Sequence, residues 1–158
     1  MERLVIKKAF VGDAALIHSL QVQAFKSLLE KYQDFETSPA SENIQRTIDR
    51  LHQIQTDYYF IVYNSIKIGA IRIVRKKNRR YRVSPLFILP EYQGKGIAKS
   101  TMQTVERMYE DGLVWELDTI LEEQKLCRLY EKLGYIMTGK LTKINERMTV
   151  AFYEKEMG

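Results

Sequence analysis

The chain has 158 residues, which is enough for one domain with a single sizeable hydrophobic core. Its composition, with 45% hydrophobic and 28% charged residues, is typical of a soluble globular protein, and no apolar run approaches the roughly 20 residues needed to cross a bilayer. The net charge of +5 fits an anionic ligand without requiring one, and the single cysteine, Cys127, excludes an intrachain disulfide and favours a reducing, cytoplasmic location.

The first third of the chain predicts a strand followed by two helices. The N-terminus is too short and too often interrupted by charges to be the apolar region of a secretory signal. Residues 4–7 are therefore predicted to form the strand. Apolar residues at helical spacing indicate the first helix: Ile17, Leu20, Ala24 and Leu28. Asp13 is the expected cap of this helix, and a loop over residues 34–40 follows it. Ser41 is expected to cap the second helix, which ends before Thr56.

A change to β-branched and aromatic residues predicts three antiparallel strands in series, over residues 58–63, 66–74 and 81–89. Asn64-Ser65 is predicted to form the tight turn between the first two. Five cations in residues 75–80 occupy the connection between the second and third strands. A solvated hairpin tip is the favoured interpretation. Contact with nucleic acid or another acidic partner is the alternative, because clustered cations neutralise phosphates.

The second half of the chain alternates strands and helices. A helix is predicted over about residues 96–109 and a strand over residues 113–120, parallel to the preceding strand because a helix connects the two. Another helix follows, with apolar residues at helical spacing: Leu126, Leu129, Tyr130 and Leu133. Gly134 is expected to end this helix. Strands over residues 135–140 and 146–153 complete one mixed α/β (α+β) domain that spans the whole chain.

A glycine-containing turn separates the third antiparallel strand from the helix that follows it. The turn reads Gln93-Gly94-Lys95-Gly96-Ile97-Ala98. The first turn of a helix carries unpaired amide N–H groups and the positive end of the helix dipole, and glycine lets the main chain approach a phosphate closely. The spacing matches neither a Walker A loop nor a dinucleotide fingerprint, so a plain glycine turn that caps the helix is the alternative.

Two segments resemble the GCN5-related N-acetyltransferase (GNAT) superfamily. The first is residues 86–98, where a strand and a proline precede the pattern Gln or Arg, two residues, Gly, one residue, Gly or Ala. The three defining places of this pattern hold Gln93, Gly96 and Ala98. The second is Leu-Tyr-Glu-Lys-Leu-Gly-Tyr at residues 129–135, which resembles a downstream segment of the family. The resemblance covers about residues 58–153.

The resemblance implies a GNAT-like domain with a mixed, mostly antiparallel sheet that is splayed at the acetyl-CoA site and flanked by helices. The gap would lie between the strands over residues 81–89 and 113–120. The pantetheine arm of acetyl-CoA would pair with the main chain of Phe87, Ile88 and Leu89. The pyrophosphate would lie on the turn and the first helical residues: Gln93, Gly94, Lys95, Gly96, Ile97, Ala98 and Lys99.

The resemblance also implies an N-acetyltransferase that moves the acetyl group directly to a primary amine. Tyr130 matches the tyrosine that serves the CoA thiolate as general acid, although its place on an apolar helix stripe also fits core packing. Glu116 is the candidate general base, with Asp118 and Glu36 as alternatives, and all three also fit a structural role. Glu123 stands where the family often has an asparagine that holds the pantetheine.

The acceptor site is expected on the first helix and the loop after it, with Tyr32, Phe35 and Glu36 as candidate contacts. Acetyl-CoA and an amine-bearing small molecule, peptide or protein are the expected partners. Neither a membrane nor nucleic acid is expected, a homodimer is left open, and the isolated His18 and His52 indicate no metal site. Two other functions are left open: a weakly active or inactive acyl-CoA-binding regulatory module, and a protein that binds nucleic acid or the ribosome through its basic hairpin.

Overall fold

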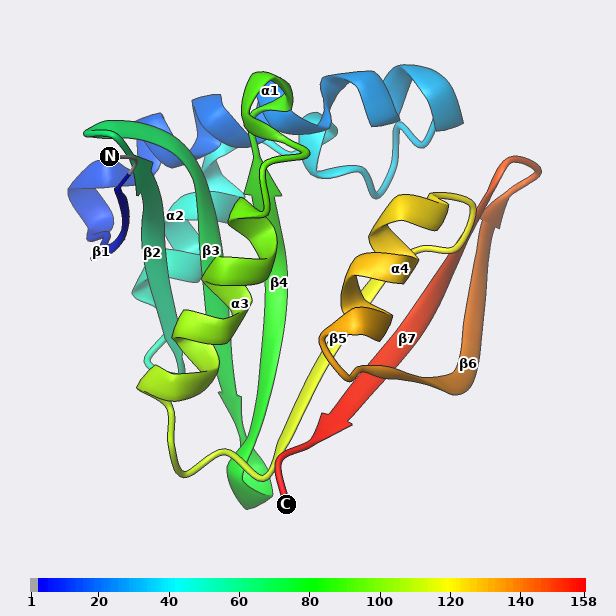
Figure 1. Ribbon diagram of the computed structural model, residues 1–158. Helices are drawn as coiled ribbons and strands as arrows, with labels where there is room; N and C mark the ends of the chain where they lie inside the picture. The colour runs from blue at the N-terminus through cyan, green and yellow to red at the C-terminus, as the bar shows by residue number, and fades with distance from the viewer. Residues whose placement is uncertain (1–2) are drawn as a thin grey trace.

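A seven-stranded sheet runs through the computed structural model, which describes residues 3–158 (Figure 1). Its strands are β1 (Leu4–Lys8), β2 (Thr56–Tyr63), β3 (Ile66–Lys76), β4 (Arg80–Ile88), β5 (Val114–Ile120), β6 (Ile136–Asn145) and β7 (Met148–Glu156). They lie in the order β1-β2-β3-β4-β5-β7-β6, and every neighbouring pair is antiparallel except β4 and β5. The predicted fold class, the three antiparallel strands and the parallel crossover are confirmed.

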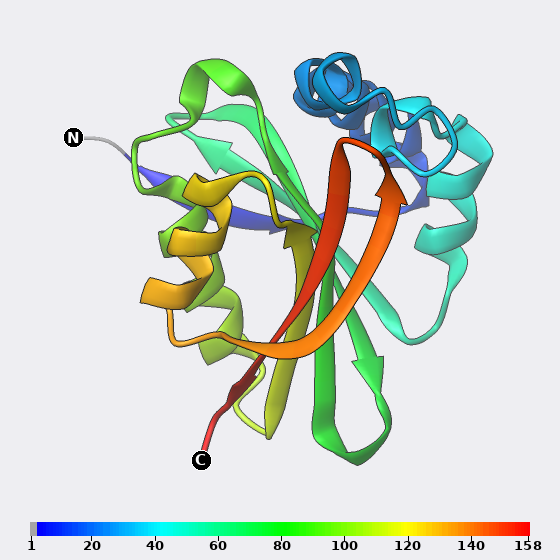
Figure 2. The same cartoon turned by 90° about the vertical axis from the view of Figure 1, so that its right-hand side faces the viewer.

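Two layers of helices enclose the sheet (Figures 1 and 2). The helices are α1 (Ala14–Tyr32), α2 (Ile44–His52), α3 (Ile97–Met108) and α4 (Gln124–Lys132). Ile17 and Leu20 of α1 pack against Phe60 on one face, whereas Met102 of α3 packs with Trp115 on the other. No helix within residues 3–158 is both long and apolar enough to span a membrane.

The alternation of side chains along β5 places different chemistry on its two faces. Trp115, Leu117 and Thr119 are buried, and the first two belong to the core under α3 and α4. The alternate residues Glu116 and Asp118 point to the opposite face, because successive side chains of a strand project to opposite sides. The period-two pattern of β5 therefore anchors the strand and presents two carboxylates to the other face.

Strands β4 and β5 pair only at one end. Their register joins Arg80–Arg82 to Val114–Glu116, and beyond these three residue pairs the strands diverge (Figure 1). The pairing of β4 with β3 also shifts register in the stretch that contains Ser84 and Pro85. Proline cannot donate an amide hydrogen bond, so an irregular position next to an unpaired strand edge suits it. The result is a sheet that opens like a V between β4 and β5.

Two of the predicted caps are corrected by the structure. Asp13 does precede α1, but its carboxylate accepts the amide N–H of Phe10 at 2.8 Å and closes a short 3-10 turn instead. Ser41 lies in another 3-10 turn, and Asn43 caps α2 by accepting the Arg46 amide at 3.3 Å. Asn43 takes this role because it stands directly before the first helical residue.

The turns around the strands agree with the sequence. Asn64 and Ser65 have positive φ angles of 49° and 69°, as a tight hairpin turn requires, and Gly134 follows α4 with φ of 98°.

The basic hairpin between β3 and β4 is held largely by ion pairs inside the chain. Arg75 pairs with Asp57 at 2.6 Å, Lys76 pairs with Glu116, and Arg80 bridges Glu116 and Glu154 at 2.9 and 2.6 Å. Within residues 3–158, Lys77 and Arg79 form no ion pair. Most of the positive charge of this segment is therefore neutralised locally, which favours the interpretation as a solvated hairpin tip.

Replacing Gly69 with alanine is expected to destabilise the protein by about 1–3 kcal/mol or more, because overpacking against rigid backbone cannot relax. An added Cβ at Gly69 would lie 2.0 Å from the carbonyl oxygen of Phe87 on β4. Urea denaturation would measure the change. Gly12→Ala is the matched control, since a Cβ there meets nothing within 4 Å. Equal stability of the two variants would contradict the expectation.

Candidate functional site

The inner edge of β4 lacks a strand neighbour along most of its length. Beyond Arg82, β5 no longer pairs with this edge. Phe87 and Ile88 fix the strand because their side chains are buried, and the Leu89 amide donates to the Ile68 carbonyl at 2.8 Å. An extended chain could therefore add to β4 as a further strand.

The turn between β4 and α3 forms a concave set of amide donors. Gly94 and Gly96 both have φ of 78°, a conformation that glycine adopts without strain. Within residues 3–158, no acceptor pairs with the amide N–H groups of residues 94–99. The Gln93 side chain donates to the Ile88 carbonyl at 2.9 Å and ties the turn to β4, while buried Ile97 anchors the start of α3. Unpaired amides at a helix N-terminus are suited to bind an anion.

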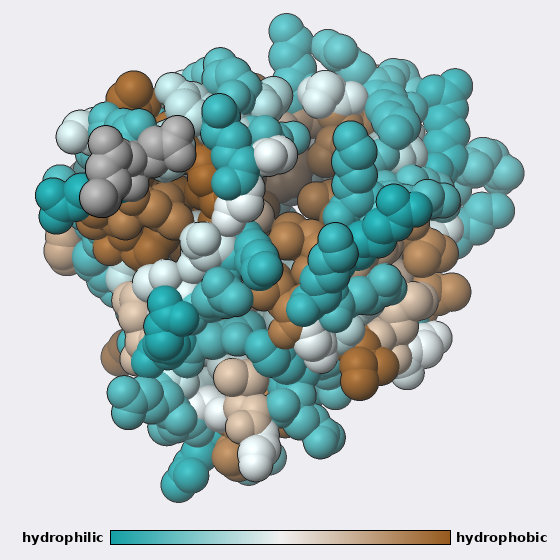
Figure 3. All heavy atoms as spheres, viewed as in Figure 1, coloured by the Kyte–Doolittle hydropathy of each residue, from teal (hydrophilic) through white to brown (hydrophobic). Residues whose placement is uncertain are grey.

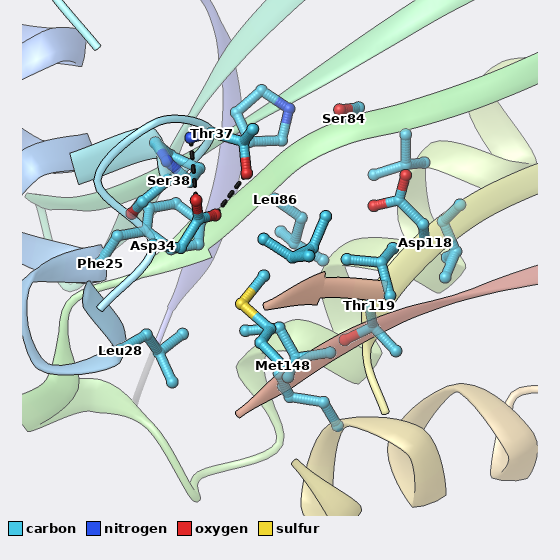
Figure 4. Close-up of a pocket in the computed structure, with 18 of the residues that line it drawn as sticks. Phe25, Leu28, Asp34, Thr37, Ser38, Ser84, Leu86, Asp118, Thr119 and Met148 are labelled. Atoms are coloured by element: carbon cyan, nitrogen blue, oxygen red, sulfur yellow. Dashed lines mark hydrogen bonds between the residues drawn. The ribbon is translucent and has the colours of Figure 1, made fainter. Parts of the chain in front are cut away.

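The molecule has a hollow on one face of the sheet and a pocket on the other. Figure 3 shows hydrophobic atoms in the hollowed centre of the face that carries α3 and α4, with hydrophilic side chains around them. On the other side of the sheet, a pocket of about 440 Å³ lies between α1, α2 and the strands β4, β5 and β7 (Figure 4). Tyr130 of α4 lines this pocket, so α4 reaches it through the gap in the sheet.

Tyr130 combines burial with access to the pocket. Its side chain is only 7% exposed and packs edge-to-face on Tyr135, with ring centroids 6.0 Å apart. Burial, and to a lesser degree the charge of Asp118, raises the pKa of Tyr130 above its ordinary value. The phenol is therefore protonated at neutral pH and can donate a hydrogen bond or a proton.

The two carboxylates of β5 lie in different surroundings. Asp118 lines the pocket with Tyr130 and forms an ion pair with Arg82. Glu116 lies at the closed end of the V, where it pairs with Lys76 and Arg80 and lines a separate groove of about 400 Å³. Burial alone would raise the pKa of Glu116, but the hydrogen bonds from these two cations outweigh it and hold the pKa below its ordinary value. The structure thus brings Asp118 together with Tyr130 and does not bring Glu116 there.

The loop after α1 reaches the pocket through residues that the sequence did not single out. Asp34, Thr37 and Ser38 line the pocket. Of the predicted contacts, Phe35 is 62% exposed and Glu36 is exposed, and neither lines it. The polar loop composition located the segment, but which of its members are buried depends on packing that the sequence does not encode locally.

Tyr32 does not line the pocket either, and it joins two elements. It is buried, and its hydroxyl donates to the Glu123 carboxylate at the start of α4. Lys31 pairs with the same carboxylate at 2.6 Å, and the Asn145 side chain donates to the Tyr32 carbonyl at 2.9 Å. Glu123, found where the related family often has asparagine, therefore holds the end of α1 against α4.

Residues 3–158 contain no group of three or more His, Cys, Asp or Glu side chains that could hold a metal ion. The polar groups at this site are main-chain amides, a phenol and carboxylates. They are suited to an anionic ligand at the turn and to an amine in the pocket.

Comparisons with known proteins agree with this geometry. A family model described as an acetyltransferase (GNAT) domain matches residues 20–156. No curated protein sequence matches the chain.

Solved structures share the fold at low sequence identity. Spermidine N-acetyltransferase from Vibrio cholerae, in complex with CoA and spermine, has 20% identity and a TM-score of 0.76, covering 97% of this chain and 95% of its own. The microcin C7 self-immunity acetyltransferase, in complex with acetyl-CoA and AMP, has 16% identity and a TM-score of 0.74, with 98% and 92% covered. A ribosomal L7/L12 α-N-protein acetyltransferase bound to CoA has 15% identity and a TM-score of 0.72, with 97% and 93% covered.

Replacing Gly96 with alanine is expected to weaken CoA binding about 5- to 30-fold, because an L-residue at φ of 78° costs about 1–2 kcal/mol and distorts the amide donors. Calorimetric titration with CoA measures this loss. Pantetheine, which lacks the pyrophosphate, should bind Gly96→Ala and the unchanged protein with similar affinity. An equal loss for both ligands would place the effect outside the turn.

Proposed function

Because the chain belongs to the GNAT acetyltransferases, we propose that it transfers an acetyl group from acetyl-CoA to a primary amine. The observation that carries the proposal is the set of unpaired amides at residues 94–99, which follow β4, a strand whose residues 83–86 line the same pocket as Tyr130. An anion-binding turn, a free strand edge and a buried phenol are the parts that a thioester-bearing diphosphate ligand requires.

The proposed placement of acetyl-CoA uses the main chain more than side chains. Its pantetheine arm pairs with the inner edge of β4 at Phe87, Ile88 and Leu89, where β5 has diverged. Its pyrophosphate accepts hydrogen bonds from the amides of residues 94–99, and the exposed Lys95 and Lys99 add positive charge. Bound there, acetyl-CoA supplies the acetyl group as an activated thioester.

The proposed chemistry needs one proton acceptor and one proton donor. The neutral amine attacks the thioester carbonyl, a C–N bond forms, and the C–S bond breaks. Tyr130 donates its hydroxyl proton, or a hydrogen bond, to the departing sulfur. Asp118 is the carboxylate best placed to accept the proton of the amine, because it shares the pocket with Tyr130. Glu116 could take this role only if its ion pairs with Lys76 and Arg80 opened.

The acceptor does not follow from the relatives. Their names refer to spermidine, a ribosomal protein and self-immunity to microcin C7, so proteins of one fold serve different purposes. At 15–20% identity these similarities establish the fold and leave the acceptor to be found by experiment. Thiol release from acetyl-CoA, measured against amines, peptides and polyamines, tests the activity. CoA binding without transfer to any acceptor would favour the alternative of a regulatory acyl-CoA-binding module.

Replacing Tyr130 with phenylalanine is expected to slow acetyl transfer about 10- to 1,000-fold while leaving the Kd for CoA unchanged, because only the proton donor is removed. Pre-steady-state transfer assays and CoA titration measure the two quantities. Tyr81→Phe is the control: it deletes the same atom, but the Tyr81 hydroxyl donates to Asp111 at 2.7 Å, outside the pocket. An unchanged rate in Tyr130→Phe would remove this residue from the mechanism.

A further inference from the structure

Asp34 is a buried carboxylate without a cation. Its side chain lines the pocket, and the whole residue is only 5% exposed. Its hydrogen bonds come from the Thr37 amide at 3.0 Å and from the Thr37 hydroxyl (Figure 4). No Lys, Arg or His in the described chain forms an ion pair with it. Carboxylates are seldom buried to this extent without a counter-ion, and this one retains accepting capacity beyond the two Thr37 bonds.

The other charges of the pocket are already compensated. Arg50 holds Glu42 with two hydrogen bonds of 2.8 and 2.9 Å, and Arg46 approaches the same carboxylate at 3.5 Å. Arg82 pairs with Asp118 on β5. The arginines that line the pocket are therefore directed at Glu42, and Asp34 is left as the lining carboxylate without a partner cation.

Asp34 and Asp118 lie on opposite sides of the cavity (Figure 4). Asp34 comes from the loop after α1, and Asp118 from β5 beside Tyr130. Leu86 lies between them in this view, and other apolar side chains, Leu28 among them, also line the cavity. A pocket with an apolar centre and a carboxylate at each side matches a chain of methylene groups with a nitrogen at each end.

We propose that the acceptor is a linear diamine or polyamine, whose second ammonium group binds Asp34 while the reacting amine lies at Asp118 and Tyr130. This inference rests on the proposed acetyl transfer, which it narrows to one class of acceptor. Asp34 acts as a specificity-determining residue: it contacts the distant ammonium group and takes no part in bond making. The energetic reason is that a desolvated carboxylate regains through the ammonium the charge-assisted hydrogen bonds it otherwise lacks.

The test compares three acceptors of matched chain length: an n-alkyl monoamine, an α,ω-diamine and an ω-amino acid. The unchanged protein should acetylate the diamine with kcat/KM at least about 10-fold above the monoamine, which corresponds to one charge-assisted contact. Asp34→Asn should remove this advantage by raising KM for the diamine, so that kcat/KM falls at least about 10-fold more for the diamine than for the monoamine. The ω-amino acid, whose far end is negative, should be the poorest of the three.

Two further variants separate charge from loop structure. Glu30→Gln removes an exposed carboxylate near the end of α1. This control variant should keep the preference of the unchanged protein for the diamine over the monoamine. Thr37→Val removes the hydroxyl that holds Asp34 but keeps its charge, so it should retain most of the preference for the diamine. If Thr37→Val reproduced the full effect of Asp34→Asn, the role of Asp34 would be ordering of the loop, and the inference would be overturned.

The inference and the proposed function fail in different ways. Equal kcat/KM for monoamine and diamine, a preference for the ω-amino acid, or an equal loss for all acceptors in Asp34→Asn would overturn the inference while transfer itself persisted. Calorimetric titration of the diamine into the protein–CoA complex gives a second readout. Binding that depends on Asp34 without any transfer would support the assigned ammonium site but refute the enzyme and, with it, the role of the diamine as acceptor. No binding in the unchanged protein would refute the inference.

Discussion

The short parallel pairing of β4 with β5 is the constraint on which the site depends. After three residue pairs the strands separate, and the inner edge of β4 is left without its strand neighbour. Main-chain donors and acceptors require partners, so a free edge inside a protein is either filled by water or available to a ligand. In the turn that follows β4, the amide N–H groups of residues 94–99 are also unpaired within the described chain. The pocket and its access to Tyr130 both follow from one incomplete sheet interaction.

Much of the architecture could be predicted from local patterns, because strand and helix periods and turn glycines report on the nearest neighbours along the chain. The turn at residues 93–98 and the helix stripe that contains Tyr130 are of this kind. The partners of Glu116 could not be predicted, since Lys76 and Arg80 reach it only through the register of a hairpin against a distant strand. Asp34 was missed for a related reason: its burial depends on how a loop packs against the sheet.

Tyr130 shows why two interpretations of one pattern need not compete. Its apolar helix stripe predicted core packing, and its side chain is indeed buried in the cluster beneath α4. The same side chain borders the pocket, because α4 lies over the place where the sheet is open. Packing restrains the ring, and such restraint suits the proton-donor role proposed for it, since a mobile donor loses geometric precision.

The contacts of Glu123 connect α1 to α4, so the two halves of the molecule are joined at a second place besides the β4–β5 pairing. The first connection is the three residue pairs between β4 and β5, and the second is the interaction of Lys31 and Tyr32 with Glu123. Tyr130 lies seven residues after Glu123, about two helical turns along α4. These contacts therefore connect α1 directly to the helix that carries the phenol. If a ligand between α1 and the sheet shifted α1, these contacts would carry the shift to α4, and thermodynamic reciprocity would make the effect mutual.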